Sequence, residues 1–278
     1  MRSRRIDKVK DLRLSGTLES WDQAEAYELW VGRWSRRVAI EFLEWLEPGA
    51  ALAWADIGCG TGQLAESIIA YHDPGSVRSI DRAPAFVAHA RRKVDDPRMR
   101  FAIADATALP WRAESFDFAV SGLVLNFVPE HEAMAREMVR VTKRGGIIGL
   151  YVWDYAGGMQ MLRHFWEAAI SVNPDDKRLD QAERFPICRP TPLAALFEHV
   201  GLNSVAVRSI DIPMEFRNFD DFWAPFLGRV GAAPTYLASL DQPTQDQIRD
   251  TLRDRVSPSG GPVALTGRAW AVKGVRTS

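Results

Sequence analysis

The stretch ALAWADIGCGTGQLAESIIAYH, residues 51–72, decides the fold. Its first part is a short apolar run, which predicts a buried strand over 51–57. A glycine-rich turn, DIGCGTG at 56–62, follows, and residues 63–72 read as a helix. A parallel strand that passes through such a turn into a helix indicates a ligand site at the carboxyl end of the strand.

The same alternation of strand and helix continues along the chain. Strands of this kind separated by helices of ten to fourteen residues predict βαβ units and a parallel sheet. Further strands are predicted at 76–81, 98–105, 115–122, 145–154, 202–212 and 262–274, and helices at 83–94, 130–143, about 158–171 and 191–201. We therefore expect an α/β fold with a doubly wound, Rossmann-like, mostly parallel sheet of seven strands, the last one antiparallel, and helical lid insertions.

The remaining segments complete the expected domain organisation. Residues 1–17 are polar and lack periodicity, which predicts a flexible N-terminal arm. Residues 18–278 are predicted to form a single domain, with lid insertions at about 154–190 and 217–262. A cap helix is expected over 21–46. Apolar residues recur there every four positions, at Ala26, Trp30, Trp34, Val38 and Phe42.

Composition excludes several classes of protein. Hydrophobic residues make up 46% of the chain, and 35 basic residues are balanced by 36 acidic ones. This balance argues against a general nucleic-acid binder, which carries a basic excess. Two cysteines, Cys59 and Cys188, cannot make a disulfide framework, so a reducing, cytoplasmic setting is expected. No apolar run reaches the ~20 residues of a membrane span, and the five histidines form no metal-ligand motif, so no metal is expected.

The glycine turn departs from the dinucleotide fingerprint. That fingerprint, GxGxxG, needs a third glycine at position 63, where this chain has Gln63. Here the turn is built on Gly58 and Gly60, and Asp56 stands two residues before the first of them. A carboxylate at this position would repel a pyrophosphate and attract a sulfonium or ammonium group. S-adenosylmethionine carries both cations, and its carboxylate would suit the N–H groups of the loop.

On these residues the chain resembles the class I S-adenosylmethionine-dependent methyltransferases, and more narrowly the ubiquinone and menaquinone biosynthesis type. The resemblance extends over about residues 22–155, including DATALPWRAESFDFAVSGLVLNFV at 105–128 and RVTKRGGIIGLYVW at 140–153. It implies S-adenosyl-L-methionine as cofactor and S-adenosyl-L-homocysteine as product. The tetrapeptide SGLV stands where methyltransferases acting on amides or exocyclic amines have Asn/Asp-Pro-Pro-aromatic, which argues against such acceptors.

The resemblance also implies roles for individual residues. Asp81 would accept bonds from the ribose hydroxyls, Asp105 would bind the exocyclic amine of adenine, and Ser121 would border the methionine portion. An aromatic residue and an arginine of the N-terminal helix would cover the methionine end. The predicted cofactor-binding residues are Tyr27, Arg33, Asp56, Gly58, Gly60, Asp81, Arg82, Asp105, Ala106 and Ser121. Alternatively, each acid caps a turn or helix, and Arg33 lies on a solvated helix face.

Methyl transfer from a sulfonium is an in-line displacement, so the protein mainly supplies proximity, alignment and exclusion of water. No catalytic residue is assigned. Candidate bases are His131, Asp154, Tyr155 and His164, although residues in such positions are more often caps or surface residues than bases. A small apolar or aromatic acceptor would fit a pocket of aromatic residues, unless these residues close the core of the insertions instead. The residues in question are Trp153, Tyr155, Phe165, Trp166, Phe222 and Trp223.

Three functions are therefore carried forward. The first is a methyltransferase that acts on a small organic molecule. The second is a nicotinamide-dependent oxidoreductase, which Asp81 allows but Asp56 and Gln63 disfavour. The third is a non-catalytic S-adenosylmethionine-binding protein. We expect a small-molecule acceptor as partner, no nucleic acid, no membrane span, and a monomer or homodimer.

Overall fold

A computed structural model describes residues 32–228 and 231–277, except for the side chain of Arg33. These residues group into two compact units. The sheet unit consists of residues 34–153, 187–210 and 269–277, and the helical unit of Asp154–Pro186 and Asp211–Arg268. The described residues do not include the predicted arm (residues 1–17) or the first part of the predicted cap helix, which contains Tyr27.

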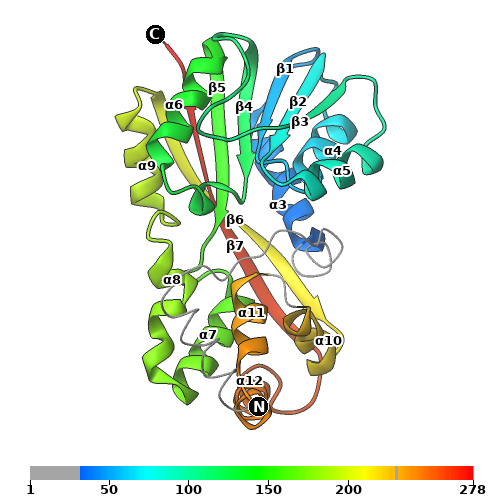
Figure 1. Ribbon diagram of the computed structural model, residues 1–278, viewed down its shortest axis with the longest axis vertical. Coiled ribbons are helices and arrows are strands. Elements are labelled where there is room, and N and C mark those ends of the chain that lie inside the picture. Colours follow the sequence, from blue (N-terminus) through cyan, green and yellow to red (C-terminus); the bar gives the residue numbers. More distant parts are fainter. Residues whose placement is uncertain (1–31, 229–230, 278) are drawn as a thin grey trace. The chain divides into compact units, whose positions relative to one another are not determined.

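A seven-stranded sheet forms the centre of the fold, with the order β3-β2-β1-β4-β5-β7-β6 (Figure 1). Four neighbouring pairs are parallel, namely β1–β2, β2–β3, β1–β4 and β4–β5, whereas β5 and β7 are antiparallel. The strands are β1 (Ala53–Ile57), β2 (Ser76–Asp81), β3 (Met99–Ile103), β4 (Phe116–Gly122), β5 (Thr142–Trp153), β6 (Asn203–Phe216) and β7 (Val263–Val275). The predicted sheet and its antiparallel last strand are confirmed.

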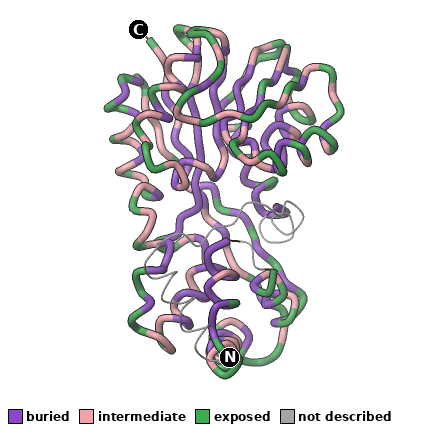
Figure 2. The backbone as a smooth tube through the Cα atoms, viewed as in Figure 1, coloured by how far each residue is buried: buried purple, intermediate pink, exposed green. Residues whose placement is uncertain are grey.

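The strand order reverses between β1 and β4. In doubly wound sheets such a switch point, at the carboxyl ends of the strands, is where ligands bind. Both strands are almost entirely buried, as the purple tube through the centre of the sheet unit shows (Figure 2). The glycine turn predicted from the sequence therefore leaves β1 at the switch point.

Helices of the sheet unit follow the predicted positions closely. They are α3 (Arg33–Leu46), α4 (Gln63–Tyr71), α5 (Pro84–Lys93), η2 (Leu125–Phe127), α6 (His131–Val141) and α9 (Pro190–His199). α5 shows why these segments are helical: Pro84 occupies its first turn and three basic residues its last, where the helix dipole favours them. α4 ends at Tyr71 because the backbone of His72 turns to the extended region.

The apolar face of α3 packs onto the sheet. Trp34, Val38 and Phe42 are buried, as the four-residue spacing predicted for the described part of this helix. A Cβ added to Gly149 of β5 would lie 3.0 Å from the Phe42 ring, so this glycine lets the helix approach the strand closely. Lys273 of β7 donates to the Trp45 carbonyl at 2.7 Å and fixes the far end of the helix.

The helical unit has a core of its own. It contains α7 (Gln160–Val172), η3 (Pro174–Leu179), α8 (Gln181–Arg184), α10 (Phe219–Trp223), η4 (Ala224–Leu227), α11 (Ala232–Ser239) and α12 (Gln242–Val256), together with the adjoining ends of β6 and β7. Side chains of Asp180, Asn218 and Asp241 accept backbone N–H groups and cap α8, α10 and α12. The ring of Phe165 stacks on that of Phe226 at 4.8 Å between centroids.

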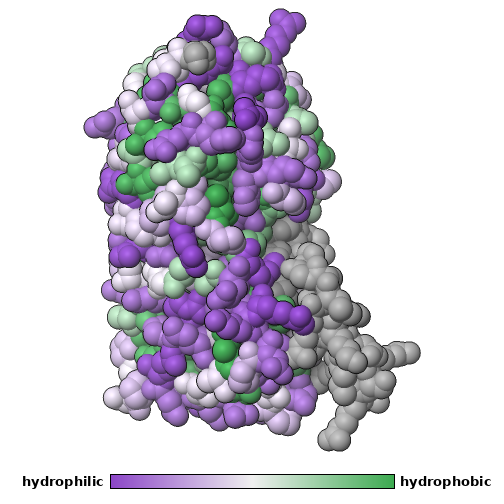
Figure 3. Space-filling model, turned by 90° about the vertical axis from the view of Figure 1, so that its left-hand side faces the viewer, coloured by the Kyte–Doolittle hydropathy of each residue, from purple (hydrophilic) through white to green (hydrophobic). Residues whose placement is uncertain are grey.

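The face of the described residues in Figure 3 is mainly hydrophilic, with hydrophobic patches between the hydrophilic residues. Large hydrophobic side chains that are exposed are Tyr71, Ile103 and Leu227. Among the helices that the structure describes, none has the length and apolar character needed to cross a membrane.

Candidate functional site

The glycine turn between β1 and α4 requires glycine for its backbone. Gly58, Gly60 and Gly62 have φ values of 77°, 52° and 87°, in the left-handed region. A Cβ on Gly58 would also lie 2.5 Å from a methyl carbon of Val124, in the loop that leaves β4. The turn and the β4 loop are therefore in direct contact at the switch point, which the sequence alone did not reveal.

Backbone N–H groups of the turn are bound within the protein. Those of Gly58 and Cys59 both donate to the Ile80 carbonyl at 2.8 Å, and that of Gly62 donates to the Cys59 carbonyl at 2.8 Å. The Gly60 N–H donates to Oδ2 of Asp81 at 2.9 Å. The expectation that the loop amides receive a ligand carboxylate is therefore wrong for these four groups, because three of them bind the end of β2 and the fourth closes the turn itself.

Asp81, the last residue of β2, stands at the centre of this arrangement. Its Oδ2 accepts from Gly60 N and its Oδ1 accepts from Ala83 N at 2.8 Å. Burial raises the pKa of its carboxyl group, and the two amide hydrogen bonds oppose this shift. Since each carboxylate oxygen can accept two hydrogen bonds, Asp81 keeps capacity for a pair of hydroxyl donors.

Asp56, in contrast, lies beneath the turn and is fully buried. The Ser79 hydroxyl donates to its Oδ2 at 3.3 Å, while its Oδ1 has no hydrogen-bonding partner among the described residues. Burial raises the pKa of its carboxyl group to about 7, and the charge of Asp81 adds to this rise. A buried acceptor without a partner beside a second acid fits a site that receives a cation.

The third acid lies in the turn after β3. Asp105 is exposed, and its Oδ1 accepts from the backbone N–H and the hydroxyl of Thr107, at 2.8 Å and 2.7 Å. These bonds, with the nearby Arg82, lower the pKa of its carboxyl group. Asp105 therefore caps a turn, as the alternative interpretation expected, but its Oδ2 forms no hydrogen bond with the described residues. Arg82 is exposed and Ala106 is partly buried.

Ser121 has a structural partner. Its hydroxyl donates to the Ile57 carbonyl at 2.7 Å and ties the end of β4 to the end of β1. The next residue, Gly122, lies opposite Tyr151 of β5, whose hydroxyl occupies the place that a Cβ would take. The Tyr151 ring also lies 4.9 Å from that of Phe42. Sequence analysis missed Tyr151, because its position follows only from the register of β4 and β5.

The N-terminal helix is anchored next to the glycine turn. Arg36 of α3 donates through Nε to Oε1 of Gln63 at 3.3 Å and forms an ion pair with Glu66 at 2.8 Å, both in the first turn of α4. Trp34 is buried, with the guanidinium of Arg37 over its ring. The predicted roles of Tyr27 and Arg33 stay predictions, since neither side chain is among those described.

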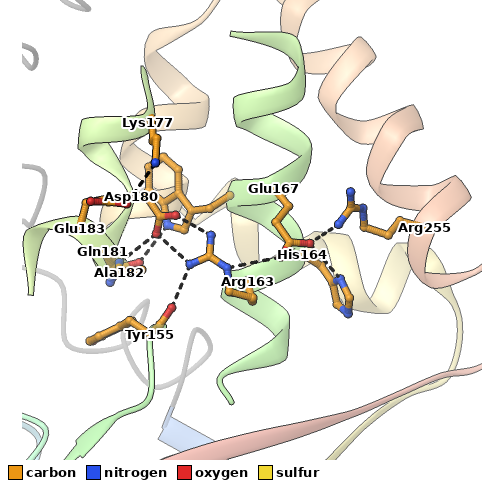
Figure 4. A network of polar contacts seen from close by, with 11 residues as sticks. Tyr155, Arg163, His164, Glu167, Lys177, Asp180, Gln181, Ala182, Glu183 and Arg255 are labelled. Atoms are coloured by element: carbon orange, nitrogen blue, oxygen red, sulfur yellow. Dashed lines mark hydrogen bonds and ion pairs between the residues drawn. The ribbon is translucent and has the colours of Figure 1, made fainter. Parts of the chain in front are cut away.

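The candidate bases occupy different surroundings. His131 begins α6 in the sheet unit, and partial burial lowers the pKa of its imidazole. In the helical unit, Asp154 accepts from Gly158 N at 2.9 Å, and the Tyr155 carbonyl accepts from Arg163 at 2.9 Å, so both stabilise local structure. His164 lies on α7 in the polar network of Figure 4, where burial lowers the pKa of its imidazole.

The aromatic residues predicted to line an acceptor pocket form cores instead. Phe165, Trp166 and Phe222 are completely or almost completely buried, and their rings pack on one another and on Phe226 and Tyr236. The remaining members of the set are buried as well, namely Trp153, Tyr155 and Trp223. The prediction of an acceptor pocket from these rings is wrong for the cluster around Phe165, because dense ring packing leaves no free face.

No group of three His, Cys, Asp or Glu side chains that could hold a metal occurs in the described part of the chain. Cys59 and Cys188 are free and buried. Burial and the charges of Asp56 and Asp81 raise the pKa of the Cys59 thiol, so this thiol stays protonated and unreactive.

Comparison with known families shows which kind of domain contains the switch point. The family model described as "Methyltransferase domain" matches residues 55–150, from the middle of β1 to β5. That segment contains the glycine turn and the acids at the ends of β2 and β3. Residues 55–150 therefore match a methyltransferase domain, and the chain is similar to class I S-adenosylmethionine-dependent methyltransferases. The recognition made from the motif at 56–62 is thereby confirmed.

Curated relatives match over the same domain. The 2-methyl-6-phytyl-1,4-hydroquinone methyltransferase of Synechocystis is 33% identical over 130 residues, which are 46% of this chain and 40% of the relative. A demethylmenaquinone methyltransferase of Lysinibacillus sphaericus is 27% identical over 171 residues, 55% of this chain and 71% of the relative. For the first relatives found, the matched region is only about two fifths of their own length.

Solved structures show the same fold. A methyltransferase structure from Bacillus halodurans has a TM-score of 0.59 and 12% identity, and the match covers 86% of this chain and 99% of the other. At this identity the likeness concerns the fold alone. This likeness in fold agrees with the seven-stranded mixed sheet of the present chain.

Proposed function

We propose that this chain binds S-adenosyl-L-methionine at the switch point and transfers its methyl group to a small, apolar or aromatic organic acceptor, leaving S-adenosyl-L-homocysteine. The observation that carries the proposal is the pairing of two acids around the glycine turn. Oδ2 of Asp81 accepts from Gly60 of the turn and Oδ1 accepts from Ala83 at the start of α5, and both oxygens keep a lone pair for a diol. Asp56 holds a buried, unpartnered oxygen beneath it.

These residues fit the cofactor group by group. The free lone pairs of Asp81 suit the two ribose hydroxyls, and Oδ2 of Asp105 suits the exocyclic amine of adenine. Asp56 has no access to solvent, so it would act on the sulfonium through its charge and not through contact. The fit requires Asp56 to be ionised when the cofactor is bound, although burial, with the charge of Asp81 in addition, raises the pKa of its carboxyl to about 7.

When bound, S-adenosylmethionine supplies a methyl group already activated on sulfur. The residues of the chain therefore need to bind, orient and exclude water, and a base is required only if the acceptor must lose a proton. Asp81 and the turn hold one end of the site. The Val124 loop, packed on Gly58, closes the side of the turn toward β4.

The acceptor class is supported by the relatives. The names of the Synechocystis and Lysinibacillus relatives specify a hydroquinone and demethylmenaquinone, both aromatic ring systems. The balanced charge of this chain gives no support to a nucleic-acid acceptor. We place the reaction in the cytoplasm, and we expect the protein to act as a monomer or homodimer.

No observation favours a nicotinamide-dependent oxidoreductase. Gln63 is buried at the start of α4, where the dinucleotide fingerprint requires glycine, and Asp56 lies directly below the turn where a diphosphate would sit. A non-catalytic protein would use the same cofactor site, so only product formation separates it from the enzyme.

The test of this proposal combines binding and turnover. Labelled S-adenosylmethionine is incubated with the protein and a bacterial metabolite extract, and methylated products are sought by mass spectrometry. Asp81→Asn is compared with Asp73→Asn, a control on the solvent-exposed acid of the α4–β2 loop. We expect product with the wild type and the control, and at least a tenfold loss with Asp81→Asn. Equal turnover by both variants would remove Asp81 from the site.

A further inference from the structure

The segment between β3 and β4 carries the acid that the proposed function assigns to the adenine amine. Residues 104–115 contain neither helix nor strand. Asp105 opens a turn there, because its Oδ1 accepts from the Thr107 N–H at 2.8 Å and its carbonyl accepts from the Ala108 N–H at 3.2 Å. These bonds fix the carboxylate relative to the turn. What fixes the turn relative to the sheet must come from other elements.

Helix α6 holds the middle of this segment through one ion pair, Glu137 and Arg140. Oε2 of Glu137 accepts from the Leu109 N–H at 2.7 Å. Arg140 donates from Nη2 to the Leu109 carbonyl at 3.0 Å and from Nη1 to the Trp111 carbonyl at 2.8 Å. Two side chains of α6 therefore bind three backbone groups of a segment that has no helix or strand of its own.

The pair is rigid before it binds the segment. Arg140 donates from Nε to Oε1 of Glu137 at 2.5 Å and from Nη2 to Oε2 at 2.7 Å, which is the strong, two-bonded form of an ion pair. These hydrogen bonds hold the pKa of the Glu137 carboxyl below its usual range and raise the pKa of the Arg140 guanidinium. Both groups therefore stay charged at neutral pH.

A second ion pair on the same helix shows what a purely local contact looks like. Arg136 donates from Nε and Nη2 to Oε1 of Glu132, at 2.8 Å and 2.6 Å. Both side chains are about half exposed, and Arg136 bonds to no backbone carbonyl of the described residues. The Glu137–Arg140 pair differs in reaching across to another segment.

The turn of Asp105 thus lies between two fixed points. On one side the Ala104 N–H donates to the Asp81 carbonyl at 3.2 Å, which ties the turn to β2. On the other side Leu109, whose side chain is buried, is held to α6 at both its N–H and its carbonyl. Release of the second point would leave the exposed carboxylate of Asp105 attached to the sheet on one side only.

We propose that Glu137 and Arg140 are positioning residues that orient Asp105 toward the adenine ring of the cofactor and so set the preference for an amino group on that ring. This inference rests on the proposed function and adds what determines its base selectivity. Neither residue of the pair touches the cofactor, since both act through Leu109 and the turn. A carboxylate selects an amine only where its free oxygen meets the N–H group at a suitable angle.

The test measures how strongly the protein prefers a purine that carries the amino group. Calorimetry gives dissociation constants for S-adenosyl-L-homocysteine and for its analogue that lacks the exocyclic amine. We expect the wild type, and Arg136→Met as the matched control on α6, to bind S-adenosyl-L-homocysteine at least tenfold more tightly than the analogue. In Arg140→Met this ratio should fall below threefold, while the affinity for the analogue stays within twofold of the wild type.

Two further variants separate positioning from a general loss of structure. Arg140→Lys keeps a charge beside Glu137 but cannot bind both carbonyls, so its ratio should fall below that of the wild type; this variant decides the question if Arg140→Met does not unfold cooperatively. In Asp105→Ala the acceptor is gone and the ratio should be close to one. Adding Arg140→Met to Asp105→Ala should then leave the ratio unchanged, because the two residues act on the same contact.

The outcomes keep the two proposals separate. A wild-type ratio in Arg140→Met and Arg140→Lys would show that Asp105 is oriented without the pair, and an equal loss of affinity for both ligands would show that the pair supports the fold alone. Either result overturns the inference, as does a wild type that binds S-adenosyl-L-homocysteine without preference over the analogue. A wild type that binds neither ligand overturns the proposed function instead.

Discussion

Asp56 is the residue whose replacement has the most calculable effect. Its carboxyl group is fully buried, has one hydrogen bond from Ser79, and has a pKa raised from 3.8 to about 7. The folded protein therefore binds a proton at this site more tightly than the unfolded chain does. Below pH 4 both states are protonated and the site has no effect on stability. As the pH rises from about 4 to 7, the unfolded chain ionises first and the wild-type protein loses stability.

The size of this loss follows from the shift. About 3 pKa units at ~1.4 kcal/mol each give about 4 kcal/mol between pH 4 and pH 8. Asp56→Asn preserves the shape and the bond from Ser79 but has no charge to bury. The free energy of unfolding of Asp56→Asn, relative to wild type, should therefore increase by about 4 kcal/mol from pH 4 to pH 8.

Urea unfolding of the intact chain, followed by circular dichroism at several pH values, measures this difference. Asp105→Asn is the matched control, because its exposed carboxylate has a lowered pKa and the sign is reversed. A lowered pKa contributes stability above the unfolded value, which is lost as the pH falls. Parallel curves for the wild type and Asp56→Asn over the whole range would refute the reasoning that Asp56 is buried without compensation.

Three further outcomes are expected. The affinity for S-adenosylmethionine relative to S-adenosylhomocysteine should rise as the pH passes 7 in the wild type and stay constant in Asp56→Asn, because only the sulfonium gains from an ionised carboxylate. Calorimetric titrations of both ligands at pH 6 and pH 8 measure this ratio of affinities. A constant ratio in the wild type would contradict the prediction. Gly58→Ala should lower the free energy of unfolding by at least about 1–2 kcal/mol because of the positive φ alone, and by more because of the clash with Val124. A denaturant midpoint of this variant at or above that of the wild type would disprove the close contact. Phe165→Ala should lose about 3–5 kcal/mol, since its ring is fully buried against Phe226; a loss below ~1 kcal/mol would favour an open pocket over a packed core.

Much of the sheet unit could be predicted because its signals are local. β2 was expected at 76–81 and is observed at Ser76–Asp81, since the short segment between Pro74-Gly75 and a proline-started helix has few alternatives. The glycine turn was recognised for the same reason: positive φ is required within five consecutive residues. Asp81 ends β2 as predicted, whereas Asp105, predicted to end the third strand, lies in the turn two residues beyond β3.

Features that depend on strand pairing were not predictable. Tyr151 lies over Gly122, and Ser121 reaches Ile57, only because β4 stands between β1 and β5 in this register. The contact of Val124 with Gly58 joins residues far apart in the sequence. Such pairs leave no local pattern, so the loop amides were expected to bind the ligand although the protein itself uses them, and the hydrogen bond of Ser121 to Ile57 was not expected.

The aromatic residues of the insertions illustrate a different limit. Sequence composition shows that rings are dense there, but not whether they face one another or a cavity. The structure answers this through the stack of Phe165 on Phe226 and the burial of Phe222. The expectation of a lid over the site stays a prediction, and so does each candidate base.

Calorimetric titration of the wild-type chain with S-adenosyl-L-homocysteine, in parallel with NAD, tests the central claim most directly. We predict micromolar-range binding of S-adenosyl-L-homocysteine, none of NAD, and a loss of ~1.5–3 kcal/mol in Asp81→Ala, which removes a charged acceptor from two hydroxyl donors. Binding of NAD in place of S-adenosyl-L-homocysteine, or an affinity unchanged in Asp81→Ala, would contradict it.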